Sequence, residues 1–91
     1  MFQFTPYKTS QISVAATVGG TQLVGANNNR SGVLIINHGT TVVYLGESGV
    51  TTSTGIFLAG SAGASIAFAT TSPIYGITAS GSQTVSILET L

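Results

Sequence analysis

Short apolar stretches alternate with glycine-containing turns along this chain of 91 residues. Twelve glycines interrupt it, and the residues between them are rich in valine, isoleucine, threonine and serine, a bias toward strands and turns. The 3.6-residue periodicity of an amphipathic helix is absent. Several short strands at close spacing are typical of an all-β sandwich or barrel. We therefore expect a small antiparallel β-sandwich, jelly-roll or immunoglobulin-like, with about seven to eight short strands.

The first clear strand is expected in residues 11–18, where apolar side chains recur at every second position. Gly19-Gly20 offers the positive φ angles of a tight hairpin turn into a return strand at 21–24. Residues 32–37 are apolar on both faces, which predicts a central strand covered on both sides and joined in a second hairpin to 42–46. Further strands are expected at 64–69, 74–79 and 83–88. The predicted core consists of Ile12, Val14, Val33, Ile35, Val43, Leu45, Ile66, Phe68, Ile77, Val85 and Ile87.

A chain of this length is expected to form one domain. We divide it into an extended arm, residues 1–9, and a single sandwich domain, residues 10–91. The arm contains Phe2, Phe4 and Tyr7. Three aromatic residues in so short a segment favour docking of the arm on a partner over a disordered terminus.

Charged side chains are almost absent from the sequence. Lys8, Arg30, Glu47 and Glu89 are the whole set, His38 is the one histidine, and there is no aspartate. Acid–base catalysis, divalent metal binding and phosphate recognition all depend on these residue types. Two cations cannot make the set of phosphate contacts that nucleic-acid binding requires. We therefore expect no enzymatic activity, no cofactor or metal, and no nucleic-acid partner.

Each group that could act in catalysis has a simpler interpretation. His38, beside Gly39, would need a nucleophile and an orienting carboxylate, and we expect a turn histidine that bonds its own backbone or a neighbouring subunit. Glu47 and Glu89 could in principle form a glycosidase acid pair, but Glu89 lies in the last expected strand, where a deep cleft is not expected. Residues 46–55 are rich in glycine but lack the lysine and the following helix of a phosphate loop.

A chain this small is expected to need partner subunits. It buries only about 60–65% of its unfolded surface, and small domains usually add disulfides, a metal or partner subunits. Cysteine is absent, and the formal net charge of zero suits a protein held inside an assembly. The N-terminus does not resemble a signal peptide, and no apolar run approaches the length of a membrane span. We expect no membrane association.

Two loop regions are candidate partner contacts. Arg30 is the sole arginine and stands just before the most apolar strand; arginine is enriched in interface cores because its planar fork makes several hydrogen bonds at once. A solvated loop cation is the alternative. Thr51, Thr52 and Phe57 belong to the longest segment without a strand pattern, and loops of this length are often functional. We expect these residues, with the aromatic residues of the arm, to lie at an interface.

Residues 32–91 resemble a family of virus proteins. After the apolar strand come Val43-Tyr44-Leu45-Gly46, Ser48–Gly55, Leu58-Ala59-Gly60, Ser72–Ile77, Ala79-Ser80-Gly81 and a final Val-Ser-Ile-Leu-Glu strand. This order resembles small β-sandwich virion proteins of tailed bacteriophages, which occur as capsid decoration (cement) proteins or as modules of head fibres and tails. The resemblance implies binding between coat subunits, frequently as a trimer, and involves no catalytic residue.

The expected function is that of a virion structural protein on the capsid surface, made in the host cytoplasm. It would bind between subunits of the major capsid protein and associate with itself, with a trimer favoured. The alternative is a tail, head-fibre or baseplate module that attaches to a host-surface glycan. Carbohydrate sites usually expose aromatic platforms with Asp, Asn or Glu nearby, and we expect most aromatic residues here in the arm or the core.

Overall fold

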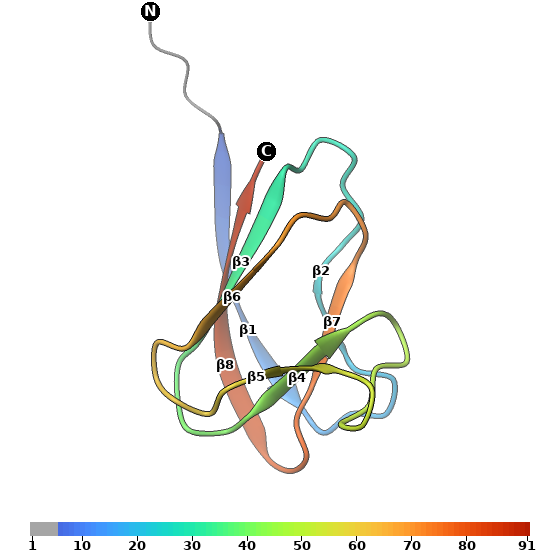
Figure 1. Ribbon diagram of the computed structural model, residues 1–91, viewed down its shortest axis with the longest axis vertical. Coiled ribbons are helices and arrows are strands. Elements are labelled where there is room, and N and C mark those ends of the chain that lie inside the picture. The colour runs from blue at the N-terminus through green and yellow to red at the C-terminus, as the bar shows by residue number, and fades with distance from the viewer. Residues whose placement is uncertain (1–5) are drawn as a thin grey trace, which may run out of the picture.

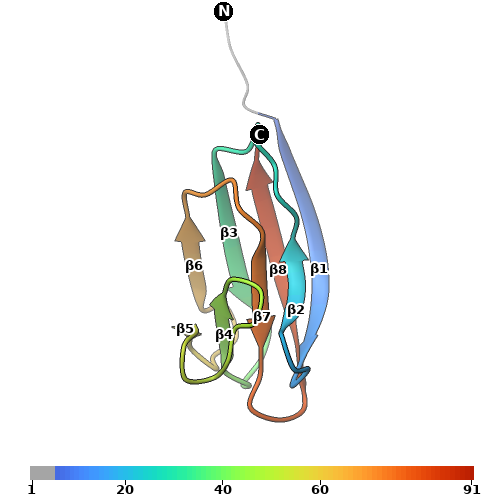
Figure 2. The same cartoon turned by 90° about the vertical axis from the view of Figure 1, so that its right-hand side faces the viewer.

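The computed structural model describes residues 6–91 and shows eight β-strands in two antiparallel sheets of four strands each. Helices are absent from these residues. The two sheets form the two layers of a sandwich (Figures 1 and 2), which confirms the predicted fold class. The strands are β1 (Tyr7–Ala15), β2 (Thr21–Val24), β3 (Gly32–Asn37), β4 (Val43–Gly46), β5 (Ile56–Leu58), β6 (Ser65–Phe68), β7 (Ile74–Ile77) and β8 (Ser82–Thr90).

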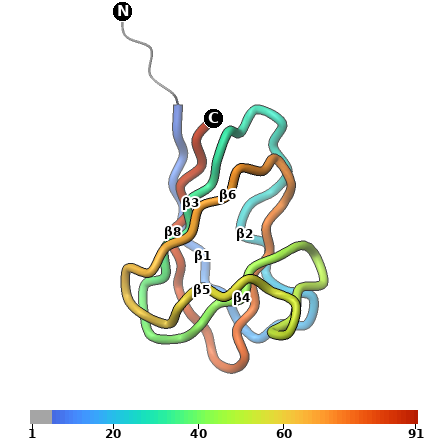
Figure 3. Tube along the Cα trace, viewed as in Figure 1, coloured from blue at the N-terminus to red at the C-terminus, as the bar shows by residue number. Residues whose placement is uncertain are grey.

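The strand order identifies the topology as a jelly roll. One sheet has the order β1-β8-β3-β6, which we call sheet A, and the other has the order β2-β7-β4-β5, which we call sheet B. Every connection except that between β4 and β5 therefore passes from one sheet to the other, as the trace in Figure 3 shows. Eight strands that alternate in this way form the double Greek key of a jelly roll, and not the seven-stranded immunoglobulin arrangement.

This topology overturns the two predicted hairpins. β1 and β2 lie in different sheets, and so do β3 and β4. Gly19 and Gly20 do have positive φ angles, of 89° and 84°, but the turn they form leads across the sandwich. β1 also ends at Ala15, so that Val18, expected on the apolar face of the first strand, is 98% exposed.

One hydrophobic core fills the space between the sheets. Ile12, Ile66 and Phe68, three of its predicted members, are partly buried against it. Most of the other predicted core positions are confirmed, and Leu23, Val24, Leu58 and Ile74 join them. The buried cluster consists of Val14, Leu23, Val24, Val33, Ile35, Val43, Leu45, Leu58, Ile74, Val85 and Ile87.

The core prediction was wrong for Ile77. β7 turns Ile74 and Gly76 inward, and a side chain at Gly76 would press on Leu23, Val43 and Leu45. Because side chains alternate between the two faces of a strand, Ile77 lies on the outer face of sheet B.

The loop between β4 and β5 is held in place by one buried side chain. Val50 is fully buried, and its methyl groups occupy the space that side chains at Gly20, Gly46 and Gly55 would need. The Gly49 N–H also donates to the Gly19 carbonyl at 3.0 Å. The absence of side chains at these three glycines therefore leaves room for Val50, whose burial ties the loop to the rest of the sandwich.

Asn37 holds the β3–β4 and β5–β6 connections together. Its side chain is fully buried, and its amide nitrogen donates to the carbonyls of Thr41 and Ala59 at 2.8 and 3.0 Å. Its side-chain oxygen accepts from the Gly39 N–H at 3.0 Å. The β3–β4 and β5–β6 connections are thereby fixed to the end of β3, close enough to each other that Gly60 lies against the Thr40 backbone.

The residues of the predicted arm fall into two groups. Tyr7, Lys8 and Thr9 belong to β1 and pair with Thr90, Glu89 and Leu88 of β8. Phe2 and Phe4 lie outside the described residues. The sandwich therefore begins at Tyr7, two residues before Thr9, where the arm was expected to end.

The packing at Gly60 gives a test of the fold. In Gly60→Ala the new methyl group would overlap the Thr40 carbonyl, so we expect a loss of about 1–3 kcal/mol in the free energy of unfolding. Gly25→Ala is the matched control, because its methyl group would meet only the flexible end of Gln22. Urea denaturation measures both, and equal stabilities of the two variants would contradict the close approach.

Candidate binding surface

The outer face of sheet A has an apolar centre. Leu34 and Ile36 of β3 point away from the core, and in the register Leu34 stands between Leu88 of β8 and Ala67 of β6. Leu34, Ile36 and Leu88 are half-buried and Ala67 is exposed. We call these four residues the apolar strip. It runs across β8, β3 and β6.

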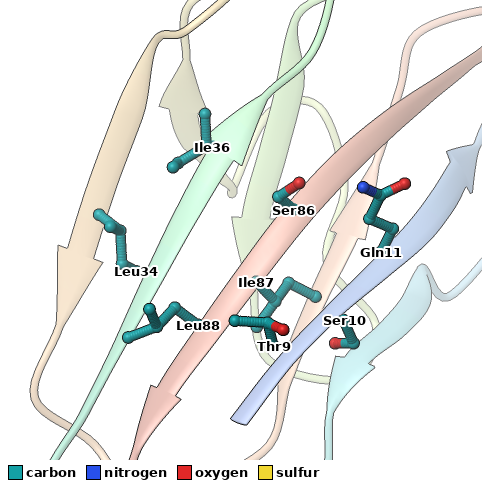
Figure 4. A pocket seen from close by; sticks show the side chains of 8 residues that line it. All are labelled: Thr9, Ser10, Gln11, Leu34, Ile36, Ser86, Ile87 and Leu88. Carbon is teal, nitrogen blue, oxygen red and sulfur yellow. The ribbon is translucent and has the colours of Figure 1, made fainter. Parts of the chain in front are cut away.

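Two shallow hollows border the apolar strip. The larger, of about 270 Å³, lies over β1, β8 and β3, and Figure 4 shows Thr9, Leu88 and Leu34 in one row across it and Gln11, Ser86 and Ile36 in the next. The second lies on the β6 side of Leu34 and Leu88. The two leucines therefore form a ridge between depressions, with hydroxyl and amide groups beside it.

The outer face of sheet A corrects the prediction that β3 is covered on both sides. The inner residues of β3 are buried under sheet B, but its outer residues alternate with them as half-exposed side chains. Within residues 6–91 no element lies over this outer face, since the sandwich has two layers. The central position of β3 in its sheet is confirmed. Its inner face is covered by sheet B, and no described residue covers its outer face.

Charge is kept away from the apolar strip. Lys8 and Glu47 are the exposed charged residues, and Arg30 and Glu89 form an internal ion pair. Lys8 lies one residue from Thr9 on β1 and therefore on the opposite face of the strand. The outer face of sheet A is consequently polar only through hydroxyls, amides and His38.

Arg30 fastens three segments to one another. Its guanidinium is fully buried and donates to the carbonyls of Thr70, Gly25 and Ser72 at 2.9, 2.9 and 2.6 Å. It also donates to a carboxylate oxygen of Glu89 at 3.1 Å. All of these partners lie in the chain itself, so neither a partner contact nor a solvated cation describes this side chain. Arg30 is an internal clamp that joins two loops to β8.

The other sequence-predicted residues are not brought together. Tyr7 is 69% exposed on β1, and Phe57 is 60% exposed on β5. These two strands are edge strands of different sheets and lie on opposite sides of the sandwich (Figure 2). Thr51 and Thr52 are exposed in a turn in which the Thr51 N–H donates to the Thr54 hydroxyl at 3.0 Å. The residues that were predicted to contact a partner thus do not form one continuous surface.

Sheet B carries three of the seven aromatic side chains on its outer face, outside the arm and the core. Tyr44 stands opposite Phe57 on one side and Ile77 on the other, and Tyr75 shares this face of β7. The rings of Tyr44 and Phe57 meet edge to face, with centroids 5.9 Å apart. We call Tyr44, Phe57, Tyr75 and Ile77 the aromatic row. The alternation around Val43 and Leu45 could have placed Tyr44 outward from the sequence alone.

The chemistry of the described residues is that of hydrogen bonding and apolar contact. His38 is exposed and its ring nitrogen Nε2 contacts the hydroxyl of Ser86. Among residues 6–91 no carboxylate hydrogen-bonds this histidine, and no group of three histidine or acidic residues gathers in one place. The same residues contain no helix that could cross a membrane.

Comparisons with protein-family models, with curated proteins and with solved structures gave no match.

The Arg30 clamp predicts a large effect on stability. Arg30→Met leaves three carbonyls and the Glu89 carboxylate without their donor, and we expect a loss of about 3–5 kcal/mol in the free energy of unfolding. Glu89→Gln keeps an oxygen acceptor for Arg30 and should lose less, about 1–2 kcal/mol. Thermal and urea unfolding measure both variants. An Arg30→Met variant as stable as the unaltered chain would show that the clamp contributes nothing.

Proposed function

We propose that this protein is a non-enzymatic virion structural protein that decorates a phage capsid and stabilises the shell. In this function the apolar strip docks against subunits of the major capsid protein. The observation that supports it most is the composition of β3, whose sequence suits a strand covered on both faces although the described chain covers one. The missing cover is then supplied by the coat.

The physical properties of the face agree with this function. Leu34 and Leu88 are half-buried in the chain alone, and each would gain free energy from burial of its remaining apolar surface. Buried charges without partners are costly, and the outer face of sheet A has none to bury. The neighbouring hydroxyls of Thr9 and Ser86 can donate to or accept from coat backbone. Many copies bound across one shell make weak individual contacts strong in sum.

The topology is compatible with this proposal and with its alternative. Jelly rolls occur in viral capsid proteins and in lectins, and fold alone does not decide between such functions. The choice depends on which outer face meets a partner. The apolar strip suits protein, whereas the aromatic row suits a ligand that stacks on rings.

The location of the protein on the source particle tests the proposal. Electron cryomicroscopy of the virion should show density of this sandwich on the shell, with sheet A toward the coat. Density confined to the tail would overturn capsid decoration.

A pair of double variants tests which face docks. Leu34→Gln/Leu88→Gln removes the apolar ridge at half-buried positions, and we expect binding to shells that lack this protein to weaken by about tenfold or more. Phe57→Gln/Ile77→Gln makes the same kind of change on the outer face of sheet B and should leave binding unaltered. Co-sedimentation with shells measures the affinity. The reverse pattern would assign docking to sheet B.

The aromatic row favours a second function, attachment to a host-surface glycan as a tail, head-fibre or baseplate module. Phe57 presents most of its ring to solvent, beside the edge of Tyr44. The Tyr75 hydroxyl donates to the side-chain oxygen of Gln22 at 3.3 Å, which places an amide beside the Tyr75 ring. Aromatic faces with nearby neutral hydrogen-bonding groups suit an uncharged sugar.

Glycan-array binding tests this second function. If it holds, the unaltered protein binds a neutral glycan, Phe57→Ala loses that signal because the exposed ring is removed, and Leu34→Gln/Leu88→Gln keeps it. The absence of any array signal from the unaltered protein would count against glycan attachment.

A further inference from the structure

The four edge strands of the sandwich differ in how well they are protected. β5 has three residues, β6 has four, and β2 has four with a register shift between Gln22 and Val24. β1 has nine residues in continuous register with β8. Proteins protect exposed edges by short strands, bulges, prolines and charges. β1 contains no proline or bulge, and the single charge of Lys8 is its one protection of this kind, so it is a long and weakly protected edge.

The hydrogen-bond pattern shows which backbone groups of β1 face outward. The Leu91 N–H donates to the Pro6 carbonyl at 2.7 Å, which makes Pro6 and Leu91 a hydrogen-bonded pair in the register that aligns Tyr7 with Thr90. Hydrogen-bonded and non-hydrogen-bonded pairs alternate in an antiparallel ladder. Even-numbered residues of β1 therefore bond to β8, and odd-numbered residues point both backbone groups away from it. The Thr78 N–H, which reaches the Ala15 carbonyl from the other side, agrees with this alternation.

Four residues in a row thus present backbone donors and acceptors at the edge of sheet A. They are Tyr7, Thr9, Gln11 and Ser13, and all four are exposed. β1 is the terminal strand of its sheet, so no other strand of residues 6–91 pairs with these groups. Figure 2 shows β1 at the margin of the sandwich, beyond β2 of the other sheet. We call these four residues the open edge.

We propose that two copies of this chain pair antiparallel through the open edge. In the register that uses all four residues, Tyr7 stands opposite Ser13 of the second copy, and Thr9 opposite Gln11 of the second copy. This register gives four hydrogen-bonded pairs and about eight backbone hydrogen bonds. Lys8 falls opposite Ile12 of the second copy, so the like charges of the two strands do not face each other.

The pairing joins two sheets A into one sheet of eight strands. The two-fold axis runs through Ser10 and is perpendicular to the sheet, which makes the interface isologous. Directly opposed residues of an antiparallel pair lie on the same face. Both apolar strips therefore face the same side of the joined sheet. Two strips on one side would bind the coat with two contacts. This advantage rests on the proposed function, but the pairing itself does not depend on that function.

The mass of the full chain in solution, and its change in one variant, test the pairing. Light scattering should give twice the mass of a single chain at high concentration. Gln11→Pro removes an N–H that points away from β8, so the β1–β8 ladder is kept, and association should weaken by about tenfold or more. Gln11→Val changes the side chain but keeps the N–H, and it should stay paired. A mass of one copy or of three copies for the unaltered chain would overturn the proposal.

A disulfide tests the register. Ser10 faces its own copy in a non-hydrogen-bonded pair, where Cα atoms lie about 4.5 Å apart, within the range that a disulfide spans. The chain has no cysteine, so Ser10→Cys introduces a single thiol. It should form a dimer under mild oxidation, while Ser65→Cys on β6, the other edge of sheet A, should not. Cross-linking through Ser65→Cys in place of Ser10→Cys would assign the contact to the other edge and overturn the proposal.

These results separate the pairing from the proposed function. A protein that stays monomeric yet binds shells through the apolar strip refutes the pairing alone. A paired protein that does not bind shells supports the pairing and refutes capsid decoration.

Discussion

The position of β8 in the centre of sheet A is the constraint on which the rest of the structure depends. This strand pairs along its length with β1 and also pairs with β3, so the last strand of the chain lies between the first and the third. Its inner residues Val85 and Ile87 are part of the core, and Glu89 receives the Arg30 guanidinium. β1 and β3 therefore cannot be joined in one sheet until β8, the last strand, is in place. Such non-local pairing makes folding slow compared with local hairpins.

The Arg30 clamp shows how this fold uses its few charges. Arg30 and Glu89 neutralise each other inside the molecule, and the guanidinium satisfies carbonyls of two loops that would otherwise lack donors. The pair removes half of the charged residues from the surface. What remains outside is a surface of hydroxyls, amides and apolar groups. The outer face of sheet A accordingly has no lysine, arginine or carboxylate side chain.

The sequence predicted the local features better than the long-range ones. Alternation in residues 11–18 placed Val14 in the core, because a period of two is a property of the strand itself. It could not show that β3 and β4 belong to different sheets. The internal contacts of Arg30 could not be predicted, because the carbonyls of Thr70 and Ser72 come from a loop that only the topology brings near. Every residue has a backbone carbonyl, so no residue type in the sequence indicates which carbonyls will accept from Arg30.

The same reasoning explains why the sequence did not reveal the two exposed surfaces of sheet A. Leu34 and Ile36 were expected to be buried because residues 32–37 are apolar on both faces. This pattern does not say whether the same chain or another chain covers each face. The strand is satisfied on one face by sheet B and left half-exposed on the other. A similar argument holds for β1, in which Tyr7, Thr9, Gln11 and Ser13 have polar side chains and ordinary backbone, so that only the terminal position of the strand in the sheet makes them an edge. Both surfaces lie on sheet A, and in our proposals each of them is covered by another chain.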